Sequence, residues 1–330
     1  MGGSERAVVG SVGHRGQQSR VVYGVRMLFS DTCPSCGNVL MVRSDWIGRR
    51  PHNFEELAFQ CEACGVGFSN STDPAGRRRI YRDPRDNVPP EVRDGLLEVL
   101  CHAVNVRNRH AKRFKFGSSR SEDALTWTIF EGLREASGLH AVLPPTSRTL
   151  AVAGPPVMLA WGHPVGDNDP DHVPEAVRVV SRDLGENPRS RSEPDIVLAW
   201  SSLIVFVEVK LDSANDLQPG HKSFPRYVDH DRNLYAAPDS VATAGFYELT
   251  RNWTIAARVA AVLGRAMLLI NLGPAALSHD ANVFSSLLVQ SDRRRFAHRT
   301  WDEVLEDAAP VAQWLAEYVR DVGLPVAPTN

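Results

Sequence analysis

The chain has 330 residues, a mass of 36.4 kDa and a composition of 43% hydrophobic and 23% charged residues, which is typical of globular proteins and excludes disordered and fibrous classes. Residues 1–120 carry a net charge of +7 and residues 121–330 one of −9, which favours a polyanion-binding module joined to a metal-binding one, with ordinary surface variation as the alternative. No apolar run approaches the roughly 18 residues that cross a bilayer, and the N-terminus lacks the apolar stretch of a secretory signal, so we expect a cytoplasmic protein with no membrane partner.

Residues 1–25 are expected to form a flexible tail, and residues 26–82 contain two Cys-x-x-Cys-Gly motifs separated by 24 residues. Each motif places two thiolates on one side of a tight turn, and four thiolates suit tetrahedral Zn²⁺. The segment between the motifs contains two short strand patterns. We therefore predict a small zinc-ribbon domain whose metal ligands are Cys33, Cys36, Cys61 and Cys64.

Other interpretations of these cysteines remain open. Two disulfides would use the same four residues, but a cytoplasmic chain disfavours them. A redox-active dithiol is disfavoured because no βαβ pattern lies beside either motif. Iron in the same four-thiolate cage is the remaining alternative to zinc. A metal ion bound in this way is structural, since four thiolates leave no open coordination position.

A helix and a basic linker are expected in residues 83–117, the helix spanning Pro90–Val106. Residues 107–120 then contain six basic residues and no acidic one, interleaved with two Phe. Such a mixture suits contacts with phosphates and bases, and a solvated linker is the alternative. The candidate nucleic-acid contacts are Arg107, Arg109, Lys112, Arg113 and Lys115.

Residues 118–330 show the alternating pattern of an α/β domain. The expected elements are a helix from Ser121 to about Ala136, strands at 150–161, 195–199 and 203–211, a long helix at 241–263, a strand at 266–272, and C-terminal helices at 275–289 and 300–320. The polar segment 162–191 is interpreted as an insertion or lid. The order α-β-β-β-α-β predicts a mixed sheet flanked by helices.

The segment Leu203–Leu211 is apolar on both faces, which is typical of a strand in a sheet that helices cover on each side. Glu208 and Lys210 stand two residues apart in it, so their side chains point to the same side of the sheet. The chain has only 4 Lys against 33 Arg, which makes a lysine at this position by chance improbable. Burying both charges requires compensation, either by an ion pair or by a metal ion with a reactive water.

Pro194 and Asp195 begin the preceding strand, 13 residues before Glu208. A short hairpin would bring the two carboxylates together at one end of the sheet, where they repel each other unless a cation lies between them. Oxygen ligands of this kind suit Mg²⁺ or Mn²⁺. A further acid, Glu122, lies on the core-facing stripe of the helix that begins after Ser121. There it either joins the metal site or interacts with the helix dipole.

These residues, Pro194-Asp195, Glu208-Val209-Lys210 and an upstream helical Glu122, resemble the PD-(D/E)xK nuclease superfamily. The order of elements over residues 118–275 is similar to the restriction-endonuclease-like core of that superfamily. The resemblance implies that Asp195, Glu208 and the Val209 carbonyl bind a catalytic Mg²⁺ or Mn²⁺, that Lys210 positions the attacking water, and that Glu122 is an auxiliary metal-binding acid. It also implies hydrolysis of phosphodiester bonds in DNA.

The expected protein is thus a metal-dependent endonuclease with an N-terminal zinc ribbon, in which the ribbon and the basic segment hold DNA. Cleavage of two strands requires two sites, so a homodimer is expected. Arg-rich, Lys-poor usage is like that of bacteria with GC-rich genomes, and by analogy we expect restriction or anti-phage defence with partner subunits. The alternative is a catalytically inactive nucleic-acid-binding or scaffold protein that uses the ribbon to dock DNA or a partner protein.

Overall fold

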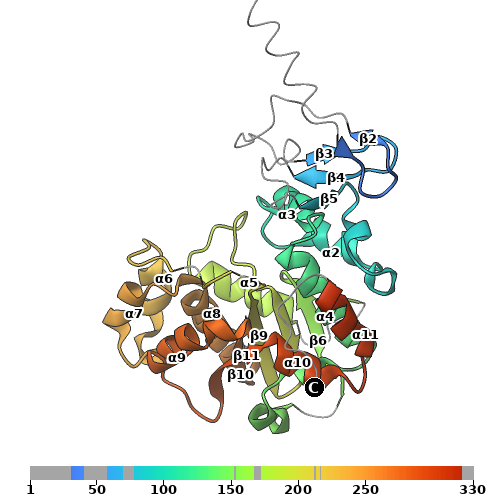
Figure 1. Cartoon of the computed structure of the whole chain (residues 1–330). Coiled ribbons are helices and arrows are strands. Elements are labelled where there is room, and N and C mark those ends of the chain that lie inside the picture. The colour runs from blue at the N-terminus through green and yellow to red at the C-terminus, as the bar shows by residue number, and fades with distance from the viewer. Residues whose placement is uncertain are drawn as a thin grey trace, which may run out of the picture. The chain divides into compact units, whose positions relative to one another are not determined.

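Figure 1 shows the computed structural model of the chain, in which residues 31–40, 58–69, 78–151, 154–166, 172–211, 213–215 and 217–321 are described. These residues divide into two compact units. The small unit comprises the described residues up to Asn87 together with Gly117–Ser119, and the large unit comprises Val88–Phe116 and the described residues from Arg120 onward. The sequence assigned residues 83–117 to a helix and a linker, but only residues 88–116 pack within the large unit, while residues 83–87 and 117–119 belong to the small one. The tail expected at residues 1–25 lies outside the described residues.

Two antiparallel sheets form the small unit. β1 (Asp31–Thr32) pairs with β2 (Val39–Leu40), and β4 (Val66–Ser69) lies between β3 (Ala58–Gln60) and β5 (Arg79–Tyr81). Two cysteines are part of its small core, together with Leu40 and Val66. With so few buried apolar side chains, this unit depends on additional cross-links for its stability.

A six-stranded mixed sheet forms the centre of the large unit, in the order β11-β10-β9-β8-β6-β7. β8 pairs antiparallel with β6 and β9, whereas β9, β10 and β11 run parallel to one another. Every residue of β8, β9 and β10 is buried, as expected for strands that helices cover on both faces. The strands are β6 (Val157–Ala160), β7 (His163–Pro164), β8 (Ile196–Ala199), β9 (Leu203–Val209), β10 (Ala266–Gly273) and β11 (Arg294–Thr300).

Successive residues of each strand face two different hydrophobic cores. On β9, Val205 and Val207 belong to one core, and Ile204 and Phe206 belong to the other. The first core contains side chains of α2 (Leu96–His102), α3 (Arg109–Phe116), α4 (Glu122–Glu135), α10 (Trp301–Ala308) and α11 (Gln313–Asp321). The second contains side chains of α5 (Val173–Asp183), α6 (Phe224–Val228), α7 (Pro238–Ala244), α8 (Tyr247–Leu263) and α9 (Ser278–Ser286).

The mixed α/β architecture expected from the sequence is confirmed, and its expected order is found as α4-β6-β8-β9-α8-β10. Other elements differ from the expectation. The helix predicted at 241–263 is divided into α7 and α8 by Gly245, whose φ of 83° lies in the left-handed region. The helix predicted at 90–106 consists of a 3₁₀ turn at Pro90–Val92 followed by α2.

Two further differences concern segments with weak apolar patterns. β11 was not predicted, because its Arg-rich sequence lacks the apolar run of the neighbouring strands, and it pairs only at the edge of the sheet. The segment 162–191, interpreted as an insertion or lid, contains β7 and α5, and α5 packs against the second core. Among the described residues, no helix combines the length and hydrophobicity that a bilayer crossing requires.

Candidate functional site

The four clustered cysteines are carried by two matching turns of the small unit. Cys33 and Cys61 each accept, at the backbone carbonyl, a hydrogen bond from the glycine amide four residues later, at 3.0 and 2.8 Å. The two glycines, Gly37 and Gly65, have φ values of 73° and 74°, which residues with a Cβ rarely adopt. This local geometry explains why a glycine follows each Cys-x-x-Cys pair.

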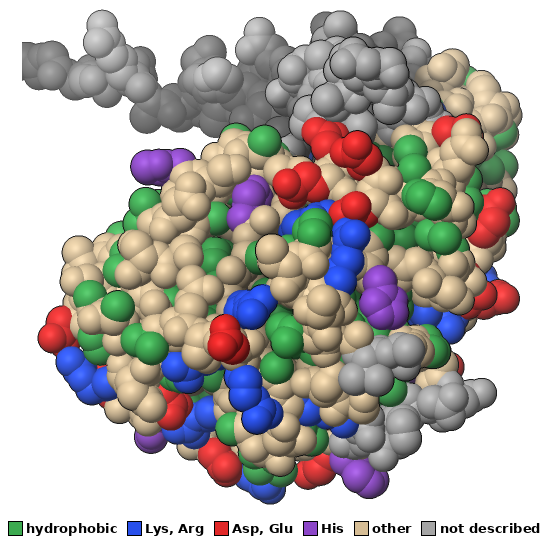
Figure 2. Space-filling view, turned by 90° about the horizontal axis from the view of Figure 1, so that it is seen from below, with side chains coloured by type: hydrophobic (Ala, Val, Ile, Leu, Met, Phe, Trp, Pro, Cys, Tyr) green, Lys and Arg blue, Asp and Glu red, His purple; other side chains and the backbone are tan. Residues whose placement is uncertain are grey.

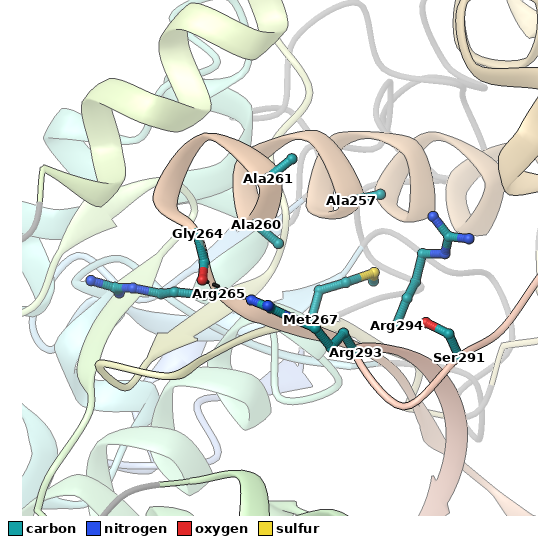
Figure 3. A pocket seen from close by; sticks show the side chains of 9 residues that line it. All are labelled: Ala257, Ala260, Ala261, Gly264, Arg265, Met267, Ser291, Arg293 and Arg294. Atoms are coloured by element: carbon teal, nitrogen blue, oxygen red, sulfur yellow. Dashed lines mark hydrogen bonds between the residues drawn. The ribbon is translucent and has the colours of Figure 1, made fainter.

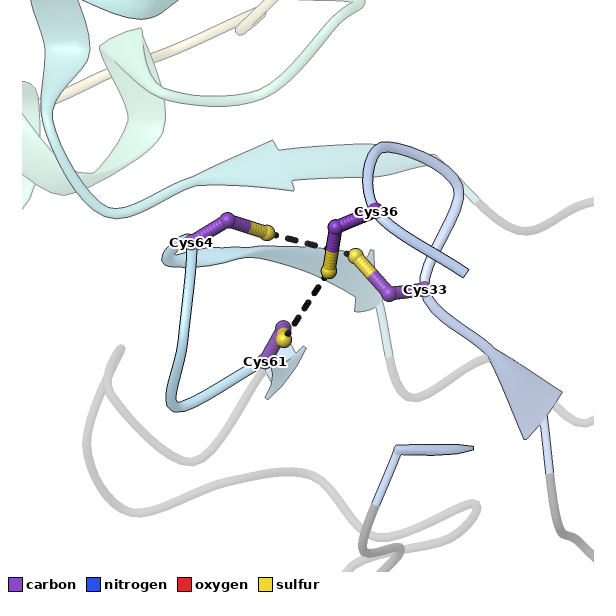
Figure 4. A group of neighbouring side chains, drawn as sticks. All are labelled: Cys33, Cys36, Cys61 and Cys64. Carbon is purple, nitrogen blue, oxygen red and sulfur yellow. Dashed lines mark hydrogen bonds between the residues drawn. The ribbon is translucent and has the colours of Figure 1, made fainter. Parts of the chain in front are cut away.

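Figure 4 shows the four sulfur atoms pointing toward one another from these turns. The Sγ atoms of Cys33 and Cys64 are 3.3 Å apart, those of Cys36 and Cys61 are 3.6 Å apart, and all four lie within 4.8 Å of one another. All four cysteines are free of disulfides. Four thiolates bound about 2.3 Å from a tetrahedral Zn²⁺ would be about 3.8 Å apart. The cluster therefore has the donor atoms and spacing of a structural zinc site.

The pKa values of the clustered thiols shift in different directions. Burial opposes the thiolate of Cys33, but the backbone amides of Cys36 and Ser35 donate toward its sulfur and lower its pKa to about 6. Backbone amides likewise lower the pKa of Cys61. The thiolate is the form that binds a metal ion. Cys36 behaves in the opposite way: its backbone contact with Asn38 lowers its pKa, but burial and the neighbouring sulfur atoms of Cys61, Cys64 and Cys33 outweigh it and raise that pKa to about 12.

The acidic residues predicted from the second half of the chain meet where β8 begins and β9 ends. Ile196 of β8 lies opposite Val207 of β9, so the next antiparallel pair is Asp195 and Glu208. The Oδ2 atom of Asp195 accepts a hydrogen bond of 2.9 Å from the amide of Val209. The strand parity places Asp195, Glu208 and Lys210 on the side of the sheet that α8 covers. The predicted hairpin is confirmed.

Lys210 and Glu208 are nearly inaccessible, with 7% and 4% of their surfaces exposed. The ammonium of Lys210 donates to Glu208 Oε1 at 2.8 Å and to Oε2 of Glu248, on α8, at 2.7 Å. Asn252, one turn further along α8, donates to Glu208 Oε2 at 2.7 Å. Trp301 Nε1 donates to the Lys210 carbonyl at 2.9 Å, which holds the end of β9 in place.

The charges of this group perturb one another. Burial raises the pKa of Asp195 well above its usual range, and the nearby Glu208 raises it further. Burial also raises the pKa of Glu208, although Lys210 opposes the change. Burial alone would lower the pKa of Lys210, but Glu208 and Glu248 outweigh it and raise that pKa. Lys210 therefore remains protonated, and the charges of Lys112 and Lys210 offset only part of the shift of Asp195. The end of β8 and β9 that carries Asp195 and Glu208 is called the acidic edge.

Glu122 reaches the same edge from the opposite side of the sheet. It is the first residue of α4, whose N-cap Ser121 accepts a hydrogen bond from the Ala124 amide at 3.1 Å. Its Oε2 atom accepts hydrogen bonds from the Leu211 amide at 2.7 Å and from the Ser213 hydroxyl at 3.2 Å. Burial raises the pKa of Glu122. Glu122 thus holds the segment that follows β9 in place through two hydrogen bonds.

The acids offer Mg²⁺ suitable donors without forming a closed cage. Within the described ranges, Asp195, Glu208 and Glu122 are not among the groups of three or more ligand-type side chains whose donor atoms all lie within 4.8 Å of one another. Mg²⁺ does not require such a cage, because it keeps several waters and commonly uses one or two carboxylates. The raised pKa of Asp195 beside Glu208 is the observation that favours a cation here. Carboxylates are the donor type that Mg²⁺ prefers, and in this structure both oxygens of Glu208 and Oδ2 of Asp195 accept hydrogen bonds from the protein itself.

The basic segment predicted to contact nucleic acid forms α3, and its members differ in accessibility. Lys112 donates to Asp123 at 2.9 Å, lies 3.3 Å from Glu193, and stacks over the Trp161 ring at 4.5 Å, so it is an internal counter-ion instead of a surface contact. Arg109 donates to the Ala103 carbonyl at 2.6 Å. The exposed members are Arg107, Arg113 and Lys115.

Three arginines from separate segments, Arg191, Arg226 and Arg251, line a cavity of about 260 Å³ in the large unit. Glu193 and Glu248 also line this cavity, which therefore opens beside the acidic edge. The buried Nε of Arg191 has no hydrogen-bond partner among the described residues. Three guanidinium groups can donate hydrogen bonds to a phosphate, but Glu186, Glu193 and Glu248 line the same space and balance their charge.

A separate cavity of about 390 Å³ lies at the other end of β10, as Figure 3 shows. Arg265, Arg293 and Arg294 line it, but Arg293 and Arg294 donate to the carbonyls of Gly264 and Val289. None of its lining residues belongs to the acidic edge. In the face drawn in Figure 2, Lys and Arg side chains are interspersed with acidic and neutral ones.

Glu248 and Asn252 are the site residues that sequence reasoning missed. Both lie on α8, one turn apart, and both contact the charged end of β9. Their spacing of four residues was a signal that they share a helix face, but nothing local indicates that this face meets Glu208. The chain matches no known family model, no curated protein and no solved structure.

Proposed function

We propose that this protein is a metal-dependent endonuclease of the PD-(D/E)xK type that hydrolyses phosphodiester bonds in DNA. The observation that carries the proposal is the convergence of Asp195, Glu208 and Lys210 on one side of two paired strands. Structural ion pairs also occur in buried strands, but two repelling carboxyls with raised pKa values beside a charged lysine are typical of catalytic sites.

Asp195 and Glu208 are the residues that would hold the divalent ion, and the resemblance adds the Val209 carbonyl. A bound Mg²⁺ or Mn²⁺ would supply Lewis-acid stabilisation of the attacking and leaving oxygens. The protein prepares this site by setting the Asp195 carboxylate on the Val209 amide, at 2.9 Å, and by holding Glu208 between Lys210 and Asn252. These contacts keep both carboxylates oriented toward the same edge.

Lys210 acts in this proposal as a hydrogen-bond donor and a positive charge. Because Glu208 and Glu248 raise its pKa, Lys210 stays protonated near neutral pH and does not act as a general base toward water. It can orient the attacking water through a donated hydrogen bond and stabilise the negative charge that develops on the phosphate. The Trp301 contact to the Lys210 carbonyl fixes the backbone from which this ammonium projects.

The arginine-lined cavity supports a polyanionic substrate. Arg191, Arg226 and Arg251 line a space that Glu248 also lines, so a phosphate held by these arginines would lie beside the acidic edge. The exposed Arg107, which precedes α3, and Arg113 and Lys115 of α3 would add contacts to the DNA backbone. We further propose that zinc stabilises the small unit and that the protein acts as a homodimer. Its role would lie in restriction or anti-phage defence, together with partner subunits.

A catalytically inactive nucleic-acid-binding or scaffold protein is the second candidate function. The observation that favours it is the engagement of both Glu208 oxygens, one by Lys210 and the other by Asn252. In such a protein these three side chains would serve only to compensate buried charge.

Cleavage assays distinguish the two candidates. Purified protein is incubated with plasmid, linear and single-stranded DNA in Mg²⁺, in Mn²⁺ and with chelator. We expect metal-dependent cleavage that falls by at least about 100-fold in Lys210→Ala and Asp195→Ala, because each removes a group that acts on the transition state or holds the ion. Lys222→Ala, at an exposed lysine, is the matched control and should cleave normally.

Cleavage that persists in chelator, or that survives both Lys210→Ala and Asp195→Ala, would contradict the proposal. DNA retention without cleavage by the folded wild-type protein would favour the second candidate. Circular dichroism of each variant verifies that the fold is intact.

A further inference from the structure

A separate group of ligand-type side chains lies where α2 meets the edge strand β7. Glu98 and His102 stand one turn apart on α2, and His163 begins β7. One donor atom from each side chain lies within 4.8 Å of the other two. Glu98 Oε1 and His163 Nε2 are 4.0 Å apart. None of these residues belongs to the cysteine cluster or the acidic edge.

A hydrogen bond prepares His102 as a ligand. Its Nδ1 lies 2.9 Å from the backbone carbonyl of Glu98, and a carbonyl can only accept. The proton therefore resides on Nδ1, and Nε2 carries the free lone pair. A donated hydrogen bond from the other ring nitrogen to a carbonyl is the usual support of a metal-binding histidine.

The second imidazole lies alongside the first. The rings of His102 and His163 are stacked, with centroids 5.1 Å apart and an interplanar angle of 22°. Two imidazoles and a carboxylate are a donor set that suits zinc and related transition metals better than Mg²⁺.

The elements that carry the three side chains are tied together by the backbone. The Val104 amide, just beyond α2, donates to the Trp161 carbonyl at 3.1 Å, just before β7. His163 pairs with Ala160 of β6 across the turn at Gly162, whose φ is 76°. Leu96 and Val99 anchor α2 in the core. These contacts fix the backbone segments that carry the three donors, although the Glu98 side chain itself is 69% exposed.

A cavity of about 250 Å³ adjoins the group, lined by Glu98, His163, Gly95, Val99, Val165 and Gly166. It leaves room for a water or another small ligand beside a metal ion held by three side chains. A three-ligand site with an open position is the arrangement of zinc sites that exchange their fourth ligand.

We propose that Glu98, His102 and His163 form a second transition-metal site, selective for Zn²⁺ and similar ions, with its fourth position open to water. This site is independent of the cysteine cluster and of the proposed nuclease chemistry. It joins α2 to the edge of the central sheet, so the bound ion stabilises the folded protein.

Titration with Co²⁺ tests the site in the full chain carrying Asp195→Ala, because Co²⁺ would otherwise also occupy the divalent-ion site proposed at Asp195 and Glu208. The cysteine cluster is first filled with one equivalent of Zn²⁺, and Co²⁺ is then added while absorption is followed. We expect one equivalent to bind, with visible d–d bands and without the near-ultraviolet charge-transfer band of a cobalt–thiolate bond. His102→Ala and His163→Ala should each weaken binding by at least about 100-fold, and Glu98→Gln by about tenfold, in line with the effect of disturbing metal ligands. His279→Ala, at an exposed histidine on α9, should leave binding unchanged.

Absence of a second bound equivalent at millimolar Co²⁺, or a thiolate charge-transfer band that shows displaced zinc, would overturn the proposal. Unchanged affinity in both histidine variants, with folding verified by circular dichroism, would also overturn it. The readout is metal binding, so a failure here is distinguishable from a failure of the nuclease proposal.

Discussion

Asp195 and Glu208 lie in surroundings that penalise their charged forms. Burial raises the pKa of both carboxyls, and the charge of Glu208 raises that of Asp195 further, while Lys112 and Lys210 oppose the shift for Asp195 only in part. A carboxyl with a raised pKa in the folded state ionises first in the unfolded state as pH increases. The free energy of unfolding therefore falls as pH rises through the window between the ordinary and the raised pKa.

Asp195→Asn should for this reason stabilise the metal-free protein above that window. Each unit of raised pKa corresponds to about 1.4 kcal/mol, and each kcal/mol to about 2–4 °C in Tm for a domain of this size. We expect a Tm increase of a few degrees at pH 8 that disappears as pH falls toward 4, measured by thermal denaturation in chelator. Asp94→Asn, at an exposed acid, is the control. A gain that is equal at all pH values, or none at pH 8, would refute the electrostatic argument.

At the scale of elements, the stability of the small unit depends mainly on the two cysteine turns. Its strands are two to four residues long, and among the described residues its hydrophobic cluster comprises Cys33, Leu40, Cys61 and Val66, with Ile80 also buried. Short strands around so small a core cannot offset the conformational entropy of folding. A structural zinc ion supplies about 10–16 kcal/mol of apparent binding free energy in comparable modules.

We therefore expect Cys33→Ser to lose one zinc equivalent per chain relative to the parent protein and to unfold the small unit. Elemental analysis measures the metal, and limited proteolysis of residues 31–87 reports the folding. Cys101→Ser is the matched control, because Cys101 is exposed and outside the cluster. If Cys33→Ser retained its zinc and its protease resistance, the assignment of the ligands would be wrong.

At the scale of the whole molecule, the net charges of +7 for residues 1–120 and −9 for residues 121–330 do not tell which basic side chains can reach DNA. Lys112 of α3 is engaged by Asp123 and Glu193, so it cannot release counterions from DNA. Arg107 and Arg113 remain exposed. The electrostatic part of DNA binding should thus depend on these surface arginines more than on the total basic charge of the segment.

The double variant Arg107→Glu/Arg113→Glu should bind DNA more weakly and with a flatter dependence on salt. Each lost phosphate contact reduces the slope of log K against log salt concentration by about one. Fluorescence anisotropy between low and moderate salt, without divalent metal, measures both quantities. Arg182→Glu, an exposed position on α5, is the control. A slope equal to that of the parent protein would show that Arg107 and Arg113 do not contact DNA phosphates.

Local sequence patterns were sufficient for several parts of this protein. The spacing of Cys33, Cys36, Cys61 and Cys64 determined the thiolate cluster, because each pair lies within one turn. The apolar run of β9 determined that Glu208 and Lys210 share a face, because side chains alternate along any strand. The α/β alternation determined the mixed sheet. Arg-rich β11 escaped prediction because its partner, β10, stabilises it more than its own composition does.

Only the tertiary structure decided which distant side chains meet. It brought Glu248 and Asn252 of α8 onto the end of β9, paired Lys112 with Asp123 and Glu193, and set His102 against His163. These partners are separated by between 11 and 81 residues in the chain. Their contacts depend on how helices pack against the sheet, and that packing is a property of the whole core, which no short segment encodes.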